Sequence, residues 1–199
     1  MDFIEKYDNV LNKTQCDQII ELFEDFHEYH HEGRAGGKVD YELKKSTSLD
    51  FTIDPSRWQG HDIALASLIF PPLLESLDKY KKKYYLLDSL ASWSMNKDYH
   101  MQRFDKDDGY YAIHCEQEGP TSRRIIAWMF YLNNAKCGTK FYYQNRTISA
   151  RQGRLLLWPA GWTHMHSGIV PNIDTKYIIT GWYSFDDDDT TVTPLKENT

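Results

Sequence analysis

Three residues in the second half of the chain have the types and spacing to bind a metal ion. His114 and Glu116 lie two positions apart in 109–116, a stretch with two tyrosines and an isoleucine that favours a strand. Side chains two apart on a strand project from one face, so the imidazole and the carboxylate would enter the same space. His166, in the cluster 158–168, adds another imidazole. Two imidazoles and one carboxylate are the ligand set of mononuclear non-haem Fe(II), which leaves positions open for a cosubstrate and O₂.

Further landmarks accompany these residues in a fixed order. They are the stretches 102–110, 128–133, 137–141, 153–159, 166–171 and 175–183. Their order and spacing resemble the 2-oxoglutarate- and Fe(II)-dependent oxygenases, specifically the branch that is similar to prolyl 4-hydroxylases. The resemblance covers the second half of the folded chain closely and the first half loosely.

The resemblance implies that His114, Glu116 and His166 bind iron and form the catalytic centre. The family more often has Asp where Glu116 stands, and Glu is one methylene longer. The family also places a Lys or Arg some ten residues past the distal His, where it holds the far carboxylate of 2-oxoglutarate, and Lys176 stands ten positions after His166. From the residues alone, Lys176 could be a strand lysine that faces solvent. If it faces inward with Ile178, it needs an anion.

The distal metal ligand has two candidates, His164 and His166, which a strand would place on one face. The family has a Gly two residues beyond the ligand and a Lys or Arg some ten residues beyond it. Gly168 and Lys176 satisfy both conditions for His166. His164 is then expected to lie behind the ligands or toward the substrate.

The resemblance also implies a cosubstrate pocket around Lys176. Tyr131 matches a family tyrosine whose hydroxyl assists the same carboxylate, although a core aromatic fits this position equally. Thr180 and Trp182 are expected to line the pocket. Phe104 stands where many prolyl hydroxylases carry another cosubstrate-binding tyrosine, so that hydroxyl is missing here.

Three residues are candidates to face the substrate. Tyr111, like its neighbour Tyr110, could replace the hydroxyl that Phe104 lacks. Arg124 falls where some relatives use an arginine toward the substrate, and a surface arginine is the alternative. His164 is the third candidate.

The resemblance implies hydroxylation of a substrate with conversion of 2-oxoglutarate and O₂ to succinate and CO₂, supported by ascorbate. A carboxylate among the iron ligands favours hydroxylation over halogenation. The substrate could be a peptidyl proline, a free amino acid or another small molecule, because a fold does not fix a substrate. Two alternatives stay open: a jelly-roll binding protein without catalysis, and a cupin-like metal site that uses His164 as well as His166.

Composition limits the classes of partner and location. The chain has 199 residues, which fit one domain, and its formal net charge of -6 makes nucleic acid or an anionic membrane an unexpected partner. No apolar run is long enough to span a bilayer, and the N-terminal residues lack the layout of a signal peptide. Three irregularly spaced cysteines read as reduced thiols. We expect a cytoplasmic protein.

Periodicity divides the chain into a helical first part and a β second part. We expect a helix over 17–29 with Thr14 as its N-cap, and two helices within 62–85 that meet at Pro71-Pro72. We expect an edge strand over 44–53 and short strands from residue 86 onward. This order predicts an α+β, mainly β, single domain over 1–185: helical support over about 12–85, then a catalytic jelly roll, or double-stranded β-helix, over about 86–185. The N-terminal helices would pack on one sheet, and 186–199 would form a polar tail.

Two clusters outside these landmarks invite functional readings. His27, His30 and His31 could suggest a metal, but a solvated helix end explains them better. The lysines and tyrosines of 79–85 could suggest nucleic-acid binding. Lysines on the solvent face at a helix C-terminus, with tyrosines toward the core, are the simpler interpretation.

Overall fold

The computed structural model of the protein describes residues 1–57 and 60–186. Its larger sheet is antiparallel. The strands of this sheet run in the order β1 (Glu5–Tyr7), β9 (Arg154–Pro159), β6 (Arg124–Tyr131), β11 (Lys176–Phe185), β5 (Asp98–Phe104), β3 (Thr47–Thr52) and β2 (His31–Glu32). An additional strand, β4 (Trp93–Met95), pairs with the end of β11. The smaller sheet has the order β10 (His166–Ile169), β7 (Gly138–Phe141) and β8 (Arg146–Ser149). The helices are α1 (Lys13–Asp25) and α2 (Gly60–Lys83).

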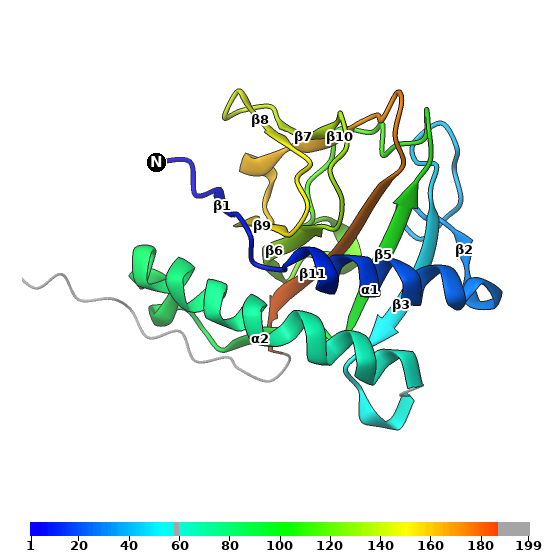
Figure 1. Ribbon diagram of the computed structural model, residues 1–199. Coiled ribbons are helices and arrows are strands. Elements are labelled where there is room, and N and C mark those ends of the chain that lie inside the picture. Colours follow the sequence, from blue (N-terminus) through cyan, green and yellow to red (C-terminus); the bar gives the residue numbers. More distant parts are fainter. Residues whose placement is uncertain (58–59, 187–199) are drawn as a thin grey trace, which may run out of the picture.

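The elements form three layers (Figure 1). The helices α1 and α2 lie across one face of the larger sheet, and the smaller sheet stands over part of the other face. This arrangement is a double-stranded β-helix with helices packed on one sheet, so the predicted mainly β jelly roll is confirmed.

Strand β6 illustrates why the larger sheet has a core on each side. Its side chains alternate between two hydrophobic clusters. Ile126, Trp128 and Phe130 pack against the helices, and Ala127, Met129 and Tyr131 face the smaller sheet. Successive side chains on a strand point to opposite faces, so a continuously apolar strand fits only where both faces are covered.

Helix α1 begins earlier than the sequence analysis predicted. Its N-cap is Asn12, whose side chain accepts a hydrogen bond from the Gln15 N–H, while the Gln15 side chain accepts from the Asn12 N–H. The prediction of Thr14 as N-cap was wrong. The reciprocal capping box gives hydrogen-bond acceptors to the backbone N–H groups of Asn12 and Gln15, which a cap at Thr14 would not do. The helix also ends at Asp25, and His27–Tyr29 form a separate 3₁₀ turn.

Helix α2 is one helix, so the prediction of two helices was wrong. Pro71 and Pro72 lie inside it and leave two carbonyls of the preceding turn without donors. The buried residues Leu65, Ile69, Leu73, Leu77 and Tyr80 form one stripe that continues across both prolines. Packing of this stripe against the sheet offsets the missing hydrogen bonds.

The stretch 109–116 is not a regular strand, in contrast to the prediction. It makes isolated β-bridges at two places, from Tyr110 to Lys44 and from His114 to His166. The chain thus crosses from the neighbourhood of β3 to the smaller sheet within a few residues. The predicted edge strand is shorter, as Thr47–Thr52, and it is covered by the two-residue strand β2.

Three further predictions concern a membrane span, the polar tail and the division of the domain. In the described part of the chain, we find no helix with the length and apolar character to cross a membrane. The predicted polar tail lies outside the described residues, apart from Asp186. The proposed division into helical support and jelly roll stays a prediction.

Candidate active site

Three predicted metal ligands come together from two segments. His166 opens β10, and His114 lies opposite it, because each residue's N–H donates to the other's carbonyl at 2.9 and 2.8 Å. Two residues further on, the Glu116 N–H donates to the Ala160 carbonyl at 3.0 Å, which holds the end of the crossing segment. The backbone therefore fixes the three side chains even though no regular strand carries the first two.

The ligand atoms converge on one point. The Glu116 Oε1 lies 3.7 Å from the His114 Nε2 and 3.2 Å from the His166 Nε2. All three ligand atoms lie within 4.8 Å of one another, and the His166 side chain is buried while the other two are half-buried. Such a group of two nitrogens and one oxygen is the facial arrangement that suits Fe(II).

The two histidines present the correct nitrogen to a metal. The His114 Nδ1 lies 2.9 Å from the Ala112 carbonyl oxygen, and the His166 Nδ1 lies 2.9 Å from the His164 carbonyl oxygen. A carbonyl oxygen only accepts, so Nδ1 carries a proton in each ring and Nε2 faces Glu116, where it donates to the carboxylate when protonated and offers a lone pair to a metal when deprotonated. A cation between these groups satisfies all three, so the residues fit an iron ion.

The Glu116 carboxylate is held in its ionised form. Its burial opposes ionisation, but hydrogen bonds and charges from His114 and His166 outweigh burial and hold the Glu116 pKa well below its usual range. Metal binding requires a deprotonated carboxylate. The site is therefore prepared for a cation at neutral pH.

The second carboxylate oxygen of Glu116 has partners of its own. The Trp182 Nε1–H donates to Oε2 at 2.9 Å, and the Arg124 Nη1 lies 3.6 Å from the same oxygen. The Arg124 guanidinium stacks on the Trp182 indole at 3.4 Å from the ring centroid. Trp182 and Arg124 thus orient the Glu116 carboxylate through Oε2, and Oε1 faces the two histidines.

These ligands lie in a cavity of about 920 Å³ between the sheets. Of the predicted site residues, His114, Glu116, His166, Lys176, Thr180, Trp182 and Arg124 line it. Thr180 also donates from its hydroxyl to the Trp128 carbonyl at 3.1 Å, which fixes its rotamer on β11. Most of the predicted constellation therefore faces one space.

Lys176 is the strongest anion-binding feature of this cavity. It is 3% exposed, its Nζ lies 4.3 Å from the centroid of the Phe104 ring, and burial lowers its pKa to about 8. A Cβ at Gly168 would lie 3.5 Å from the same Nζ, so glycine keeps the space beside the ammonium open. No carboxylate of the described residues pairs with Lys176. A buried ammonium of this kind fits the far carboxylate of 2-oxoglutarate.

Tyr131 stands one layer behind the cavity wall. Its hydroxyl lies 2.7 Å from the Thr139 Oγ1, and Thr139 lines the cavity. Tyr131 is therefore placed to orient the threonine hydroxyl. Thr139 was not predicted as a site residue, although its Gly-Thr-Lys context was one of the landmarks.

Two predicted substrate residues point elsewhere. The Tyr111 hydroxyl donates to the Asp107 carbonyl at 2.9 Å, on the outer side of the crossing segment. The His164 Nε2 lies 2.8 Å from the Asp2 carbonyl oxygen, and its Nδ1 lies 2.9 Å from the Thr163 hydroxyl. We retain neither as a substrate residue, because neither lines the cavity. For His164 the alternation of a regular strand fails because Trp162–His164 is a 3₁₀ turn.

Two further residues line the cavity: Tyr110, which the sequence suggested only as a replacement for the Phe104 hydroxyl, and Lys44, which it did not suggest. Tyr110 stacks on the His114 imidazole, with ring centroids 3.8 Å apart and an interplanar angle of 15°. Lys44 lines the cavity and is only 5% exposed, although its sequence suggested a charged residue on an edge strand. A tyrosine pair in the family's cosubstrate region gave a signal for Tyr110, and no local pattern marks Lys44.

Comparisons with known proteins agree with this geometry. Residues 99–184 match the family model described as the 2OG-Fe(II) oxygenase superfamily, and the match includes His114, Glu116, His166 and Lys176. A search of curated protein sequences found no match.

Solved structures share the fold. The viral collagen prolyl hydroxylase of Paramecium Bursaria Chlorella virus-1, in a 2OG complex, has 17% identity and a TM-score of 0.66, with 94% of this chain and 97% of that chain covered. A Pseudomonas putida prolyl-4-hydroxylase has 14% identity and a TM-score of 0.64, with 94% and 95% covered. A Trichoplax adhaerens prolyl hydroxylase, in complex with a hypoxia inducible factor peptide fragment, has 14% identity and a TM-score of 0.69, with 92% and 84% covered.

The matched segment, the convergent ligand atoms and the buried lysine lead to one family. Residues 99–184 are similar to the 2OG-Fe(II) oxygenase superfamily, the whole chain has a fold of the prolyl 4-hydroxylase-like type, and together with the ligand triad these findings support an oxygenase that uses Fe(II), 2-oxoglutarate and O₂.

Proposed function

We propose that this oxygenase hydroxylates a small molecule or a peptide residue that enters the cavity beside His114, Glu116 and His166. One observation carries the proposal: three convergent ligand atoms share a cavity with Lys176, a buried ammonium that has no carboxylate partner among the described residues. A metal and a dicarboxylate satisfy both features together. Fe(II) with 2-oxoglutarate and O₂ supplies the oxidising chemistry when bound, and succinate and CO₂ are released.

The chain's own residues have distinct roles in this proposal. His114, Glu116 and His166 hold the metal, and Trp182 with Arg124 orients the Glu116 carboxylate. Such outer partners of metal ligands tune both affinity and geometry.

The cosubstrate has its own set of residues. Lys176 binds the far carboxylate of 2-oxoglutarate, and Thr139, oriented by Tyr131, donates to the same group. Thr180 closes the wall on β11. Burial of these groups excludes water and strengthens each electrostatic contact.

The alternatives from the sequence are less well supported. A cupin-like site would use the His164 imidazole, which is engaged by Asp2 and Thr163. A binding protein without catalysis has no need for a buried, unpaired Lys176 beside a metal-ligand triad. A peptidyl proline is one candidate substrate, supported by the fold type alone, and the cytoplasmic location stays a prediction from the sequence.

Succinate formation tests the proposed function. Purified protein with Fe(II), ascorbate, 2-oxoglutarate and O₂ is expected to form succinate slowly even without a substrate. His166→Ala is expected to abolish the reaction, and Lys176→Met is expected to require at least tenfold more 2-oxoglutarate. His27→Ala, an exposed histidine outside the cavity, is the matched control and should leave the rate unchanged. Absence of succinate from the wild type at saturating Fe(II) and 2-oxoglutarate would refute the proposal.

A further inference from the structure

Two buried lysines line the same cavity, and the proposed function uses one of them. Lys176 is assigned to the cosubstrate, and Lys44 is left without a role. Lys44 precedes β3 and is 5% exposed. Its Nζ lies 3.4 Å from the Arg34 carbonyl oxygen, a long hydrogen bond, and 5.1 Å from the centroid of the Tyr110 ring. No carboxylate of the described residues pairs with it.

The carboxylates nearest to Lys44 are already engaged. Glu116 accepts from Trp182 and faces the two histidines of the triad. Asp50 lies 2.6 Å from the His100 Nδ1 and 3.2 Å from the His31 Nε2. Both carboxylates act on Lys44 only at longer range, and burial lowers the Lys44 pKa to about 8. An ammonium buried in this way is stabilised by an anion that enters the cavity.

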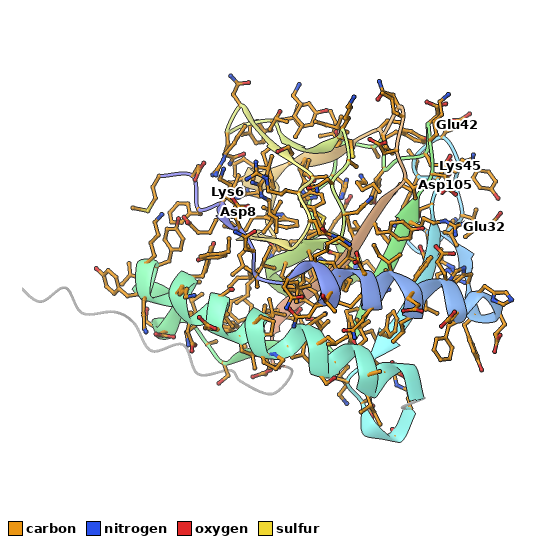
Figure 2. All side chains as sticks on the ribbon, in the orientation of Figure 1. Lys6, Asp8, Glu32, Glu42, Lys45 and Asp105 are labelled. Atoms are coloured by element: carbon orange, nitrogen blue, oxygen red, sulfur yellow. The ribbon has the colours of Figure 1, made fainter. Side chains whose placement is uncertain are left out.

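The next residue in the chain provides the contrast. Lys45 has a side chain that is 55% exposed and pairs with Asp108 at 2.8 Å. Figure 2 shows Lys45 at the surface, near Glu42 and at the same end of the molecule as Asp105. Lys45 behaves as the charged edge residue that the sequence predicted. Lys44 points the other way, into the cavity, so the two lysines form a matched pair for experiments.

Lys44 is near the metal ligands but has neighbours different from those of Lys176. The Tyr110 ring, over which the Lys44 Nζ lies, stacks on the His114 imidazole. The Tyr110 ring therefore separates an anion on Lys44 from His114, a proposed iron ligand. Lys176 instead contacts Phe104 and the space beside Gly168. One small dicarboxylate satisfies Lys176, and a second anionic group is needed for Lys44.

We propose that Lys44 binds a carboxylate of the substrate, so that the enzyme acts on a carboxylate-bearing molecule of the amino-acid class. The inference rests on the proposed function, because it needs a hydroxylation substrate in this cavity. The carboxylate comes either from a free amino acid or from an acidic side chain of a peptide. An internal, uncharged peptide segment does not neutralise Lys44.

The test uses Fe(II)-loaded protein with 2-oxoglutarate, without O₂, and follows the visible absorbance of the metal complex. Three probe mixtures are added separately: free L-amino acids, the same amino acids as α-amides without Asp and Glu, and the α-amides of N-acetyl-aspartate and N-acetyl-glutamate. We expect the first or the third mixture to perturb the spectrum and to raise succinate formation in air, and the second to do neither. The responding mixture identifies the source of the carboxylate.

Variants assign the response to Lys44. Lys44→Met is expected to weaken the response at least tenfold, Lys44→Arg to restore part of it, and Lys45→Met to leave it unchanged. No response to any mixture, an equal response to the uncharged amides, or an unchanged response in Lys44→Met overturns the inference. Equal loss of 2-oxoglutarate affinity in Lys44→Met and Lys176→Met also overturns it, because Lys44 then serves the cosubstrate.

The two proposals fail in different ways. If the wild-type protein shows no 2-oxoglutarate-dependent absorbance with Fe(II), the proposed function fails before any probe is added. If that absorbance is present, is lost in His166→Ala and persists in Lys44→Met, the fold of the variant and the proposed function both stand. The probe mixtures then test only the role of Lys44.

Discussion

The two faces of the larger sheet have opposite chemical character. The face covered by α1 and α2 buries apolar side chains such as Trp128, Phe130 and Ile179 without exposure to solvent. The face toward the smaller sheet mixes apolar residues with buried polar ones, including Gln102 and Lys176. Both faces come from the same strands, because alternate residues point in opposite directions. The helix-covered face therefore supplies stability, and the other face accepts unfavourable burial of charge in order to bind ligands.

Truncation on the helix-covered face is expected to have the largest effect on stability. Phe130→Ala removes a fully buried ring from the contact with the helices and should lower the free energy of unfolding by about 3–5 kcal/mol. Denaturant unfolding of the metal-free protein measures this change. Binding of Fe(II) at a temperature where the variant is folded should be retained. A loss of metal binding by the folded variant would contradict the separation of the two faces.

Replacement of a buried charge on the other face should raise the free energy of unfolding, which is the opposite effect. Burial lowers the pKa of Lys176 from 10.5 to about 8, which corresponds to about 3 kcal/mol of unfavourable free energy at neutral pH. Lys176→Met should therefore stabilise the metal-free protein by up to about 3 kcal/mol while it weakens 2-oxoglutarate binding. Unfolding without ligands at pH 7 measures the first effect. A destabilised variant would show that Lys176 has a counter-charge in the free protein.

The pH dependence of stability sharpens the same point. Between the folded pKa of about 8 and the unfolded value of 10.5, the unfolded chain holds the Lys176 proton and the folded chain does not. Stability of the wild type relative to Lys176→Met should therefore rise as pH increases from 8 toward 10.5 and stay at its lowest, nearly constant level below 8. Denaturant unfolding of both proteins from pH 7 to 10 isolates this contribution. An unchanged difference would mean that burial does not perturb Lys176.

A change behind the metal ligands should have an intermediate effect. Trp182→Phe keeps an aromatic ring but removes the Nε1–H that donates to the Glu116 Oε2 at 2.9 Å. We expect a 10- to 100-fold loss of Fe(II) affinity. Equilibrium dialysis against Fe(II) without O₂ measures the loss. Trp128→Phe is a suitable control, because the Trp128 indole N–H has no hydrogen-bond partner among the described residues and its ring packs on the helix-covered face, away from the ligands.

A change on neither face should have the smallest effect. Lys13 and Asp17 form an exposed ion pair at 2.5 Å on the outward side of α1. Lys13→Ala should change the free energy of unfolding by less than about 0.5 kcal/mol and should leave Fe(II) binding unaltered. Calorimetry at low and moderate salt checks the value. A change above 1 kcal/mol would mean that helix α1 depends on its surface charges.

The sequence predicted those parts of the site that depend on order along the chain. Family spacing singled out His114, Glu116, His166 and Lys176, and the structure brings all four to one cavity. Their roles stay predictions. The α+β jelly roll followed from the same landmarks and from the change from helical to strand periodicity. Local alternation, in contrast, misplaced His164, because Trp162–His164 is a 3₁₀ turn and not a strand. Tyr111 was named to replace the hydroxyl that Phe104 lacks, and its hydroxyl donates to the Asp107 carbonyl instead.

The missing parts depend on contacts that are distant in the sequence. Lys44 is turned into the cavity by its bridge to Tyr110, 66 positions away along the chain, and nothing next to it differs from the exposed Lys45. Helix α2 continues through Pro71 and Pro72 because packing of one unbroken apolar stripe against the sheet stabilises the continuous helix. Intrinsic helix propensity does not include such tertiary packing, so it predicts a helix break at these prolines.

One measurement tests the central claim that the cavity between the two sheets holds iron and 2-oxoglutarate together. Fe(II)-loaded protein is titrated with 2-oxoglutarate in the absence of O₂, and its visible absorbance is followed. We predict a new absorbance band that saturates at one 2-oxoglutarate per chain, is absent in His166→Ala and requires at least tenfold more 2-oxoglutarate in Lys176→Met. A wild-type protein that binds Fe(II) but gives no such band, or a band that persists in His166→Ala, would contradict the account.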